Sequence, residues 1–258
     1  MKADEPRSNP NDFQERLAAE TDPGRRMDLI DEVLRPPEPQ LLDTCVLQNL
    51  DYLYRTFEPS GSVVRDDAAA AALIQRYGTE LADDMIALDT MYRRHEYESG
   101  YPWLICSAAV KEAGLLSGAK GESLKQFIEF LTGHQDDWSN DAYPGIAQGL
   151  LLTQGFRVSP LILKALSVKS PEEVHSTNGP LNFLPDQGDR LVATHAMLSN
   201  IPVVLTTDRK SFWTHRERLS ELGVQVMRPV ELLNLYEPYW EALDNEFRRR
   251  SGKAEADN

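Results

Sequence analysis

Short runs of consecutive apolar residues alternate along the chain with segments whose apolar residues recur every three or four positions. The first run begins at Leu41, and the other three span residues 103–106, 202–206 and 224–227. Runs of this length indicate buried strands, and the spacing between them indicates helices. Strands that alternate with helices favour a mainly parallel sheet covered on both faces. The pattern therefore predicts an α/β fold with a mainly parallel central sheet.

The clearest alternation lies in the last third of the chain. The strand at 202–206 follows one predicted helix, and the strand at 224–227 lies between two more. These three helices are predicted over residues 186–199, 211–222 and 229–249. Near the start of the sheet, the strand that opens at Leu41 is expected to run directly into a helix that passes through Tyr54.

The middle of the chain is predicted to be mostly helical. Apolar residues recur at helical spacing over residues 66–98, which predicts one long helix or two helices divided at Gly78-Thr79. After the strand at 103–106, Ser107 is placed to cap the next helix. The chain is predicted to be helical again over 122–170, with breaks at Gly133 and at 143–145, and then to form a loop over 171–185.

The same pattern predicts how the chain is organised into domains. Residues 1–39 contain two short amphipathic stretches and a cluster of prolines, so a helical arm with a Pro-rich linker is expected there. Residues 40–250 are predicted to form one α/β domain, enlarged by helical insertions at about 55–100 and 119–180. Residues 251–258 are expected to be a disordered tail.

Composition narrows the classes of function. The net charge of −14 argues against broad, non-specific binding of nucleic acid through an all-basic surface. A local basic patch is enough for phosphate contacts, although such a cluster can also be the solvated face of a helix. The candidate patch consists of Arg209, Lys210, His215, Arg216 and Arg218, and the first four of these are the expected substrate-binding residues.

The chain shows no targeting or membrane-spanning segment. Its N-terminus lacks the apolar stretch of a signal peptide, and no segment approaches the ~20 uninterrupted apolar residues of a membrane span. A cytoplasmic protein without a membrane partner is therefore expected. Cys45 and Cys106 both fall inside apolar runs interpreted as strands, which predicts buried thiols rather than a disulfide.

Acidic residues stand where predicted strands end or helices begin. Asp43 and Asp208 follow two strands, and Glu112 and Asp189 lie near the starts of two helices. In parallel sheets these positions converge on one crevice. Several carboxylates in one cleft repel each other unless a cation lies between them, and oxygen ligands favour Mg²⁺ or Mn²⁺ over zinc. Thr206, two residues before Asp208, could orient a water or a carboxylate.

Simpler interpretations exist for each of these residues. Asp189 could be an ordinary acid at a helix start, and Asp43 could cap a turn. Asp186 competes with Asp189 for the third acidic position, although the N-cap of the same helix is the favoured role for Asp186. Glu122 competes weakly with Glu112. The five histidines show no metal-ligand spacing; they are His95, His134, His175, His195 and His215.

These segments resemble the PIN-domain nucleases, a family that includes the VapC-type toxins. The resemblance rests on the Leu-Leu-Asp-Thr-X-Val-Leu opening around Asp43, the small-residue helix from Asp189, and the Val-Leu-Thr-Thr-Asp strand at 204–208 followed by Phe212. The Leu232-Leu233 run also resembles the family's closing strand-to-helix junction. Two features depart from the family: Cys45 stands where many members have Asn, and the helical insertions make the chain about twice as long as the small toxins.

The resemblance implies a three-layer α/β/α sandwich with a mainly parallel central sheet, and cleavage of RNA at a Mg²⁺ or Mn²⁺ site. Carried over motif by motif, Asp43, Asp189 and Asp208 take the family's acidic positions, and Glu112 matches the second acidic motif. Thr206 takes the family's hydroxyl position. The four carboxylates are then the implied metal ligands, and these five residues are the implied catalytic set.

The expected function is that of a metal-dependent endoribonuclease, with a toxin role in a toxin–antitoxin or defence module left open. One alternative is a catalytically degenerate PIN-like protein that binds RNA or acts as a scaffold. A lesser alternative is a haloacid-dehalogenase-like phosphatase, which needs a second Asp where this chain has Cys45. RNA is the expected substrate; an antitoxin, another protein partner or a homo-oligomer is left open, as is cleavage of DNA instead of RNA.

Overall fold

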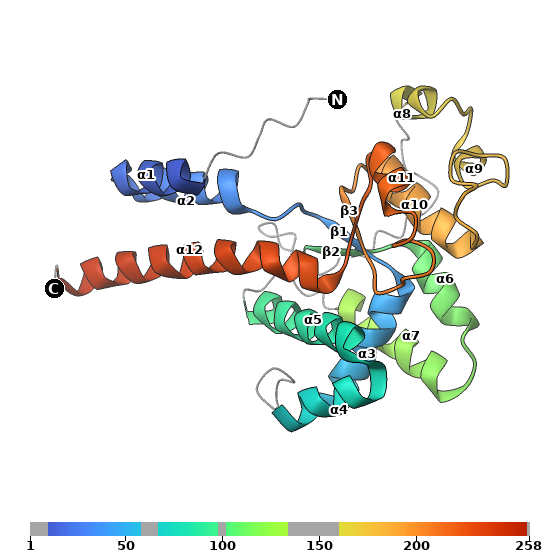
Figure 1. The fold of residues 1–258 in the computed structure, drawn as a ribbon, viewed down its shortest axis with the longest axis horizontal. Helices are drawn as coiled ribbons and strands as arrows, with labels where there is room; N and C mark the ends of the chain where they lie inside the picture. The colour runs from blue at the N-terminus through green and yellow to red at the C-terminus, as the bar shows by residue number, and fades with distance from the viewer. Residues whose placement is uncertain (1–9, 58–66, 98–101, 134–159, 257–258) are drawn as a thin grey trace. The chain divides into compact units, whose positions relative to one another are not determined.

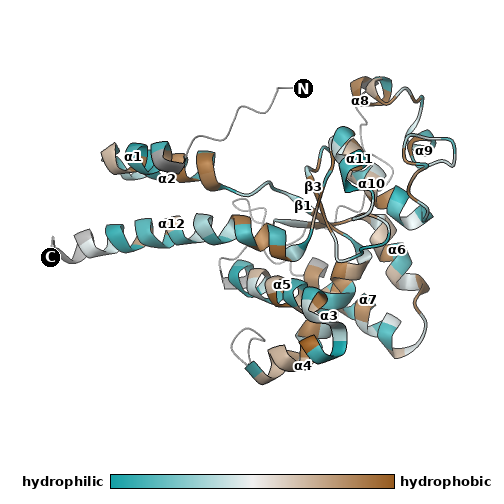
Figure 2. Ribbon diagram, viewed as in Figure 1, coloured by the Kyte–Doolittle hydropathy of each residue, from teal (hydrophilic) through white to brown (hydrophobic). Residues whose placement is uncertain are grey.

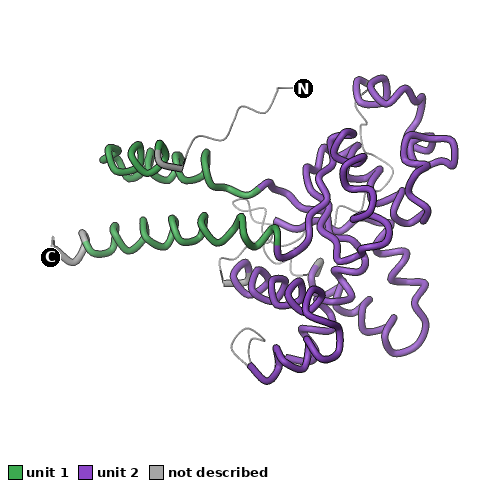
Figure 3. The backbone as a smooth tube through the Cα atoms, in the orientation of Figure 1, with its two compact units in different colours: residues 1–36, 231–258 green, residues 37–230 purple. Residues whose placement is uncertain are grey.

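A computed structural model describes residues 10–57, 67–97, 102–133 and 160–256 (Figure 1). The chain divides into two compact units (Figure 3): unit 1 contains residues 1–36 and 231–258, and unit 2 contains residues 37–230. None of the helices in the described ranges is both long enough and apolar enough to cross a membrane.

Unit 2 contains a parallel β-sheet. In the described part of the chain the sheet has four strands in the order β2-β1-β3-β4. The strands are β1 (Gln40–Leu42), β2 (Trp103–Ile105), β3 (Val203–Leu205) and β4 (Gln225–Met227). The predicted α/β fold with a parallel sheet is therefore confirmed. The strands β2, β3 and β4 are shorter by one or two residues than the apolar runs that predicted them, and β1 begins at Gln40, one residue before the predicted start at Leu41.

The two central strands are buried along their whole length. Every residue of β1 and β3 is buried, which explains why both appear in the sequence as continuous apolar runs rather than as alternating patterns. Leu42 pairs with Ile105 on one side and with Leu205 on the other. The carboxyl ends of β2, β1 and β3 therefore lie in register, and the residues that follow them meet at one edge of the sheet.

Helices make up most of the remainder of unit 2. They are α3 (Thr44–Phe57), α4 (Asp67–Tyr77), α5 (Thr79–Tyr97), α6 (Ser107–Leu115), α7 (Gly118–Gly133), α8 (Pro160–Ala165), α9 (Pro171–Val174), α10 (Gln187–Ser199) and α11 (Arg216–Glu221). The helix α3 packs against α5, α6 and α7, and α10 packs against α6 and β3. Hydropathy colouring shows apolar residues on the strands and on α3 (Figure 2).

The predicted division of the long helical segment is confirmed. Helix α4 ends at Tyr77, and α5 begins at Thr79. Between them Gly78 has φ +79°, a backbone conformation that glycine adopts without steric cost. The predicted break at Gly133 coincides with the end of α7, whereas the break at 143–145 lies outside the described residues.

Several local predictions were wrong. The segment 211–222 was predicted to be one helix, but α11 begins only at Arg216, because the Asp208 carboxylate accepts the amide protons of Lys210 and Ser211 and holds the chain in turns. Ser107 is the first residue of α6 rather than its cap. The predicted loop at 171–185 contains the short helix α9.

Neither cysteine lies in a strand, contrary to the prediction. Cys45 is in the first turn of α3, because the helix begins directly after Asp43, and Cys106 is the N-cap residue of α6. Both are free thiols. Cys106 is fully buried and Cys45 is half-buried.

Unit 1 is helical and has its own apolar cluster. Its helices are α1 (Pro10–Ala19), α2 (Pro23–Leu34) and α12 (Pro229–Ala256), the last of which belongs to unit 1 from Glu231 onward. Phe13, Leu29 and Ile30 are buried there against apolar residues of α12 that include Tyr239 and Leu243. These contacts group α12 with the N-terminal arm, whereas the sequence assigned residues 231–250 to the α/β domain.

The predicted disordered tail is largely helical. Helix α12 continues to Ala256, through residues such as Arg, Lys, Ala and Glu that favour helices. Toward its C-terminal end the helix is mainly polar (Figure 2).

One buried carboxylate in unit 1 is surrounded by three arginines. Glu246, which is 2% exposed, forms ion pairs with Arg26, Arg249 and Arg250. The hydrogen bonds that Arg249, Arg26 and Arg250 donate to it lower the pKa of Glu246 to about 2. Because this pKa is lowered in the folded state, the ion pairs stabilise the unit above the carboxyl's ordinary pKa of 4.5, and this stabilisation is lost as the pH falls toward about 2.

We therefore expect Glu246→Gln to destabilise the protein by roughly 1–3 kcal/mol at neutral pH, because three arginines lose their charged partner. Partial exposure of the arginines to solvent limits the size of this effect. The difference from the wild type should shrink as the pH is lowered below the carboxyl's ordinary pKa. Urea unfolding followed by circular dichroism measures both effects. Glu241→Gln, at an exposed position of the same helix, is the matched control; an equal effect of the two substitutions would contradict the assigned role of Glu246.

Candidate active site at the ends of the central strands

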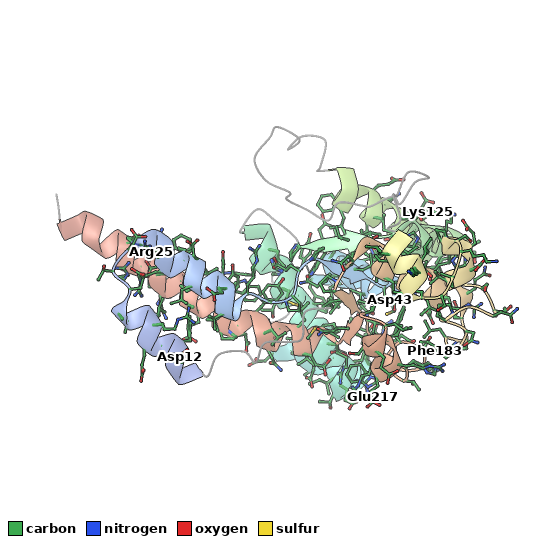
Figure 4. All side chains as sticks on the ribbon, turned by 90° about the horizontal axis from the view of Figure 1, so that it is seen from above. Asp12, Arg25, Asp43, Lys125, Phe183 and Glu217 are labelled. Atoms are coloured by element: carbon green, nitrogen blue, oxygen red, sulfur yellow. The ribbon has the colours of Figure 1, made fainter. Side chains whose placement is uncertain are left out.

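Asp43 lies at the junction between β1 and α3 and is labelled in Figure 4. Its backbone N–H donates a hydrogen bond to the carbonyl of Leu205 at 3.1 Å, which extends the β1–β3 ladder by one residue. Its own carbonyl accepts the amides of Val46 and Leu47, which starts α3. Only 4% of Asp43 is exposed. The strand and the helix therefore fix a carboxylate in the interior at the edge of the sheet.

Three uncharged donors hold the Asp43 side chain. Oδ1 accepts the Thr44 amide at 2.7 Å, and Oδ2 accepts the Thr206 hydroxyl at 2.7 Å and the Cys45 thiol at 2.9 Å. Burial raises the pKa of the Asp43 carboxyl, the three hydrogen bonds counteract this effect, and the charge of Glu112 adds to it. The net result is a raised pKa, so these donors compensate the buried charge only in part.

Thr206 connects the first and last acidic positions. It is fully buried, and its Oγ1 donates to Asp43 while accepting the backbone N–H of Asp208 at 2.9 Å. The half-buried Asp208 carboxylate accepts the amides of Lys210 at 3.0 Å and Ser211 at 2.8 Å. Asp43, Thr206 and Asp208 thus form one hydrogen-bonded chain across the ends of β1 and β3.

Cys45 is a member of this site that the sequence interpretation assigned to the core. Its sulfur donates to Asp43, lies 3.3 Å from Thr206 Oγ1, and accepts the Thr207 amide at 3.3 Å. Burial and the neighbouring Asp43 charge raise the pKa of the Cys45 thiol well above its usual range. The thiol therefore remains protonated at neutral pH and acts as a hydrogen-bond donor.

Asp186 and Asp189 have different roles on α10. Asp186 is the N-cap residue, as favoured from the sequence, and its Oδ1 accepts the amides of Gly188 at 2.6 Å and Asp189 at 3.4 Å. Asp189 is half-buried. Burial raises the pKa of its carboxyl to about 7, and the charges of Asp43, Asp186 and Asp208 contribute to the rise. Asp189 therefore lies within electrostatic reach of both acids at the strand ends.

Glu112 reaches the same region. The helix α6 buries Ala108, Ala109 and Ala113 and leaves Leu115 85% exposed. Glu112 Oε2 nevertheless accepts the Thr44 hydroxyl at 2.7 Å. The same oxygen lies 3.4 Å from where a Cβ would stand at Gly188. Glu112 thus contacts the beginnings of both α3 and α10.

Hydrogen bonds or electrostatic contacts therefore connect all five residues of the predicted catalytic set. In the described ranges, however, no three His, Cys, Asp or Glu side chains lie close enough together to form a ready-made metal site. The competing acid Glu122 is exposed on α7.

The histidines do not contribute to a metal site in the described residues. Burial lowers the pKa of His95 to about 3 and that of His195 to about 4, so both are neutral at physiological pH. His134 lies outside the described residues.

The way its charge is compensated distinguishes Asp43 from the other buried carboxylates that the structure describes. Each of those is paired with arginine: Asp51 with Arg55, Asp84 with Arg228, Asp89 with Arg93, and Glu246 with three arginines. Asp43 instead has hydroxyl, thiol and amide donors, and its nearest charged neighbours include other carboxylates. Negative charge at this edge of the sheet is thus left without a basic partner among the described residues.

The residues predicted to bind substrate have varied surroundings. Arg209 forms an ion pair with Glu80, and Lys210 is exposed. His215 is the N-cap residue of α11, and its ring lies 5.4 Å from that of Phe183. The guanidinium groups of the last two basic residues lie over aromatic rings: Arg216 over Trp213 at 3.9 Å and Arg218 over Phe183 at 4.2 Å.

Comparison of the chain with family models, with curated proteins and with solved structures found no match.

The raised pKa of Asp189 makes the stability of the folded protein depend on pH. Because its folded-state pKa is about 7 and its ordinary value is 3.8, ionised Asp189 destabilises the fold above neutral pH, and this cost declines as the pH falls from about 7 toward 4. In a chelator, Asp189→Asn should therefore have a higher Tm than the wild type at about pH 8, by roughly 2–4 °C, with a smaller difference at about pH 5.

Thermal unfolding monitored by circular dichroism at several pH values measures this difference. Asp28→Asn, at an exposed position of α2, is the control and should show no such pH dependence. A Tm difference for Asp189→Asn that stays constant with pH would show that its carboxylate is not held among other charges.

Proposed function

We propose that the protein is a Mg²⁺- or Mn²⁺-dependent endoribonuclease of the PIN type, with a three-layer α/β/α core, acting in the cytoplasm. The observation that carries the proposal is the arrangement around Asp43: a buried carboxylate at a strand end, without an arginine, linked through Thr206 to Asp208 and flanked by Glu112 and Asp189. Every other buried carboxylate among the described residues has a basic partner.

The donors at this edge of the sheet fit a hard divalent cation. They are carboxylate oxygens, which Mg²⁺ and Mn²⁺ prefer, and the protonated Cys45 thiol is a poor ligand for softer metals. Burial raises the pKa of Asp189, and the charges of Asp43, Asp186 and Asp208 add to the rise; a bound cation would offset both effects. Asp43, Asp189, Asp208 and Glu112 would hold such an ion, directly or through water.

Hydrolysis of a phosphodiester needs an activated water and stabilisation of added negative charge. A carboxylate-bound divalent ion supplies both, because it polarises the phosphoryl oxygen and lowers the pKa of a bound water. The protein's own contribution is orientation. Thr206 and Cys45 fix one oxygen of Asp43, and the turn after β3 fixes Asp208 through two backbone amides. Preorganised ligands of this kind do not have to reorder when substrate binds.

The segment that follows Asp208 is proposed to contact RNA. Between residues 209 and 218 it carries five basic or histidine side chains and one acid, in a chain with a net charge of −14. Arg216 and Arg218 lie over the half-buried rings of Trp213 and Phe183. Aromatic rings combined with guanidinium groups suit the bases and phosphates of an unpaired strand. Phe212 is fully buried, so it serves the core and not the substrate.

A second candidate is a PIN-like protein that binds RNA or a protein partner without cleaving it. The observation that favours it is that no ready-made metal group is present among the described residues. Binding of Mn²⁺ separates the two candidates, because a degenerate site would not take up the ion. An antitoxin-like partner or a homo-oligomer is compatible with either candidate.

The first prediction of the proposed function concerns Asp43. Asp43→Asn should lower Mn²⁺-dependent cleavage of single-stranded RNA at least about 100-fold, because it removes a ligand charge at the centre of the site. The same variant should be at least as stable as the wild type in a chelator, since it removes a buried charge. A gel-based cleavage assay and a thermal melt provide the two measurements.

The matched control is Glu122→Gln, which removes an exposed carboxylate of α7 and should cleave like the wild type. Normal cleavage by Asp43→Asn would overturn the assignment of the site.

The second prediction concerns the form of the RNA. The protein should bind and cut an unpaired strand in preference to a perfect duplex, because duplex bases cannot splay onto aromatic side chains. Trp213→Ala should weaken binding of single-stranded RNA by roughly 5–100-fold, the range expected for one lost base-stacking contact. Fluorescence anisotropy in the Asp43→Asn background, with chelator, measures binding without cleavage.

Phe247→Ala is the control for this experiment, because Phe247 is a 54% exposed aromatic residue that lies outside the basic segment. Equal affinity for duplex and unpaired RNA, or an unchanged affinity in Trp213→Ala, would count against this substrate surface.

A further inference from the structure

Ser211 is a buried polar residue to which the sequence interpretation assigned no role. It lies in the turns between β3 and α11 and is only 5% exposed. Its backbone N–H donates a hydrogen bond to Asp208 Oδ2 at 2.8 Å. Its hydroxyl oxygen is buried and has no hydrogen-bond partner. Ser211 therefore combines one satisfied contact to a site carboxylate with one unused polar group.

An unpartnered buried hydroxyl is unusual, because buried polar groups are nearly always hydrogen-bonded. Two contacts restrain the backbone at Ser211: the next residue, Phe212, is fully buried, and the Asp208 carboxylate holds the Ser211 amide. The buried hydroxyl therefore lies beside the Asp208 turn, within the carboxylate site.

The Ser211 hydroxyl lies near the Asp189 carboxylate as well as beside the Asp208 turn. The hydroxyl is close enough to lower the pKa of that carboxyl, yet the two groups do not make a hydrogen bond of ordinary geometry. Asp189 comes from α10, and Asp208 follows β3. Ser211 thus stands between two carboxylates from different elements, with its amide on Asp208 and its hydroxyl toward Asp189.

We propose that Ser211 is a positioning residue of the carboxylate site, whose hydroxyl donates to Asp189 while its amide holds Asp208, so that the two carboxylates are oriented together toward one divalent cation. This inference rests on the proposed metal-dependent function. A neutral hydroxyl suits the role, because it orients a carboxylate without cancelling the charge that attracts the cation. A lysine or arginine at this position would compete with the metal.

A positioning role and a merely structural role of Ser211 predict different behaviour of the Ser211→Ala variant. If Ser211 only supported the fold, Ser211→Ala would lower stability whether or not metal is present. If it positions Asp189, the variant should be as stable as the wild type in a chelator, because it removes a hydroxyl that has no partner there. Its affinity for Mn²⁺ should fall by about 10–100-fold, the usual effect of removing a group that orients a metal ligand.

The experiment measures Mn²⁺ binding by isothermal titration calorimetry and Tm in a chelator, both on the full chain, for the wild type, Ser211→Ala and Ser211→Thr. The threonine variant keeps the hydroxyl and should retain most of the Mn²⁺ affinity. Ser220→Ala, which removes an exposed hydroxyl from α11, is the matched control and should bind Mn²⁺ like the wild type. The substitution Ser211→Ala should have no further effect on Mn²⁺ affinity in an Asp189→Asn background, because its effect passes through that carboxylate.

The outcomes are distinguishable. Wild-type protein that binds no Mn²⁺ overturns the proposed function and this inference with it. Wild-type protein that binds Mn²⁺, with unchanged affinity in Ser211→Ala, overturns the inference alone. A drop in Tm in the chelator that accompanies the loss of affinity assigns Ser211 to the fold and also overturns the inference, as does an undiminished effect in the Asp189→Asn background.

Discussion

The hydrogen bond from the Thr206 hydroxyl to the Asp43 carboxylate connects the architecture of unit 2 to its chemistry. It joins residues that are 163 positions apart, at the ends of the two central strands, and it is buried at both ends. A carboxylate at this depth needs compensation, and uncharged donors supply only part of it. The parallel pairing of β1 with β3 sets the position of the bond, since the residues after Leu42 and Leu205 must emerge side by side.

The neighbouring elements extend this arrangement without neutralising it. The backbone N–H of Asp208 donates to the same Thr206 hydroxyl, and the Cys45 thiol donates to the same Asp43 oxygen. Glu112 accepts the hydroxyl of Thr44, the residue that follows Asp43. Elsewhere among the described residues, buried acids are matched with arginines, as at Asp84 and Glu246. The buried acidic side chains therefore differ in how their charge is compensated. Buried acids on the helices are paired with arginines, whereas the acids at the strand ends have no basic partner among the described residues.

The sequence predicted the regular elements well where local rules decide them. Periodicity located the strands and most helices, Gly78 marked the division between α4 and α5, and Asp186 was recognised as a cap, because helix starts and glycine turns depend on a few neighbouring residues. Local rules failed where side chains override them. The helix predicted at 211–222 starts late because the Asp208 carboxylate captures two backbone amides, an interaction that hydrophobic spacing does not encode.

The sequence by itself identified most members of the candidate site: the acids Asp43, Glu112, Asp189 and Asp208, and the hydroxyl of Thr206. The tertiary structure alone decided how these groups are supported. It brought the Cys45 thiol and the Ser211 amide to the carboxylates, placed Glu112 against Thr44, and grouped α12 with the N-terminal arm. The physical reason is that periodicity reports which face of an element is buried, whereas the partners of a buried polar atom depend on chain segments that meet only when the protein folds.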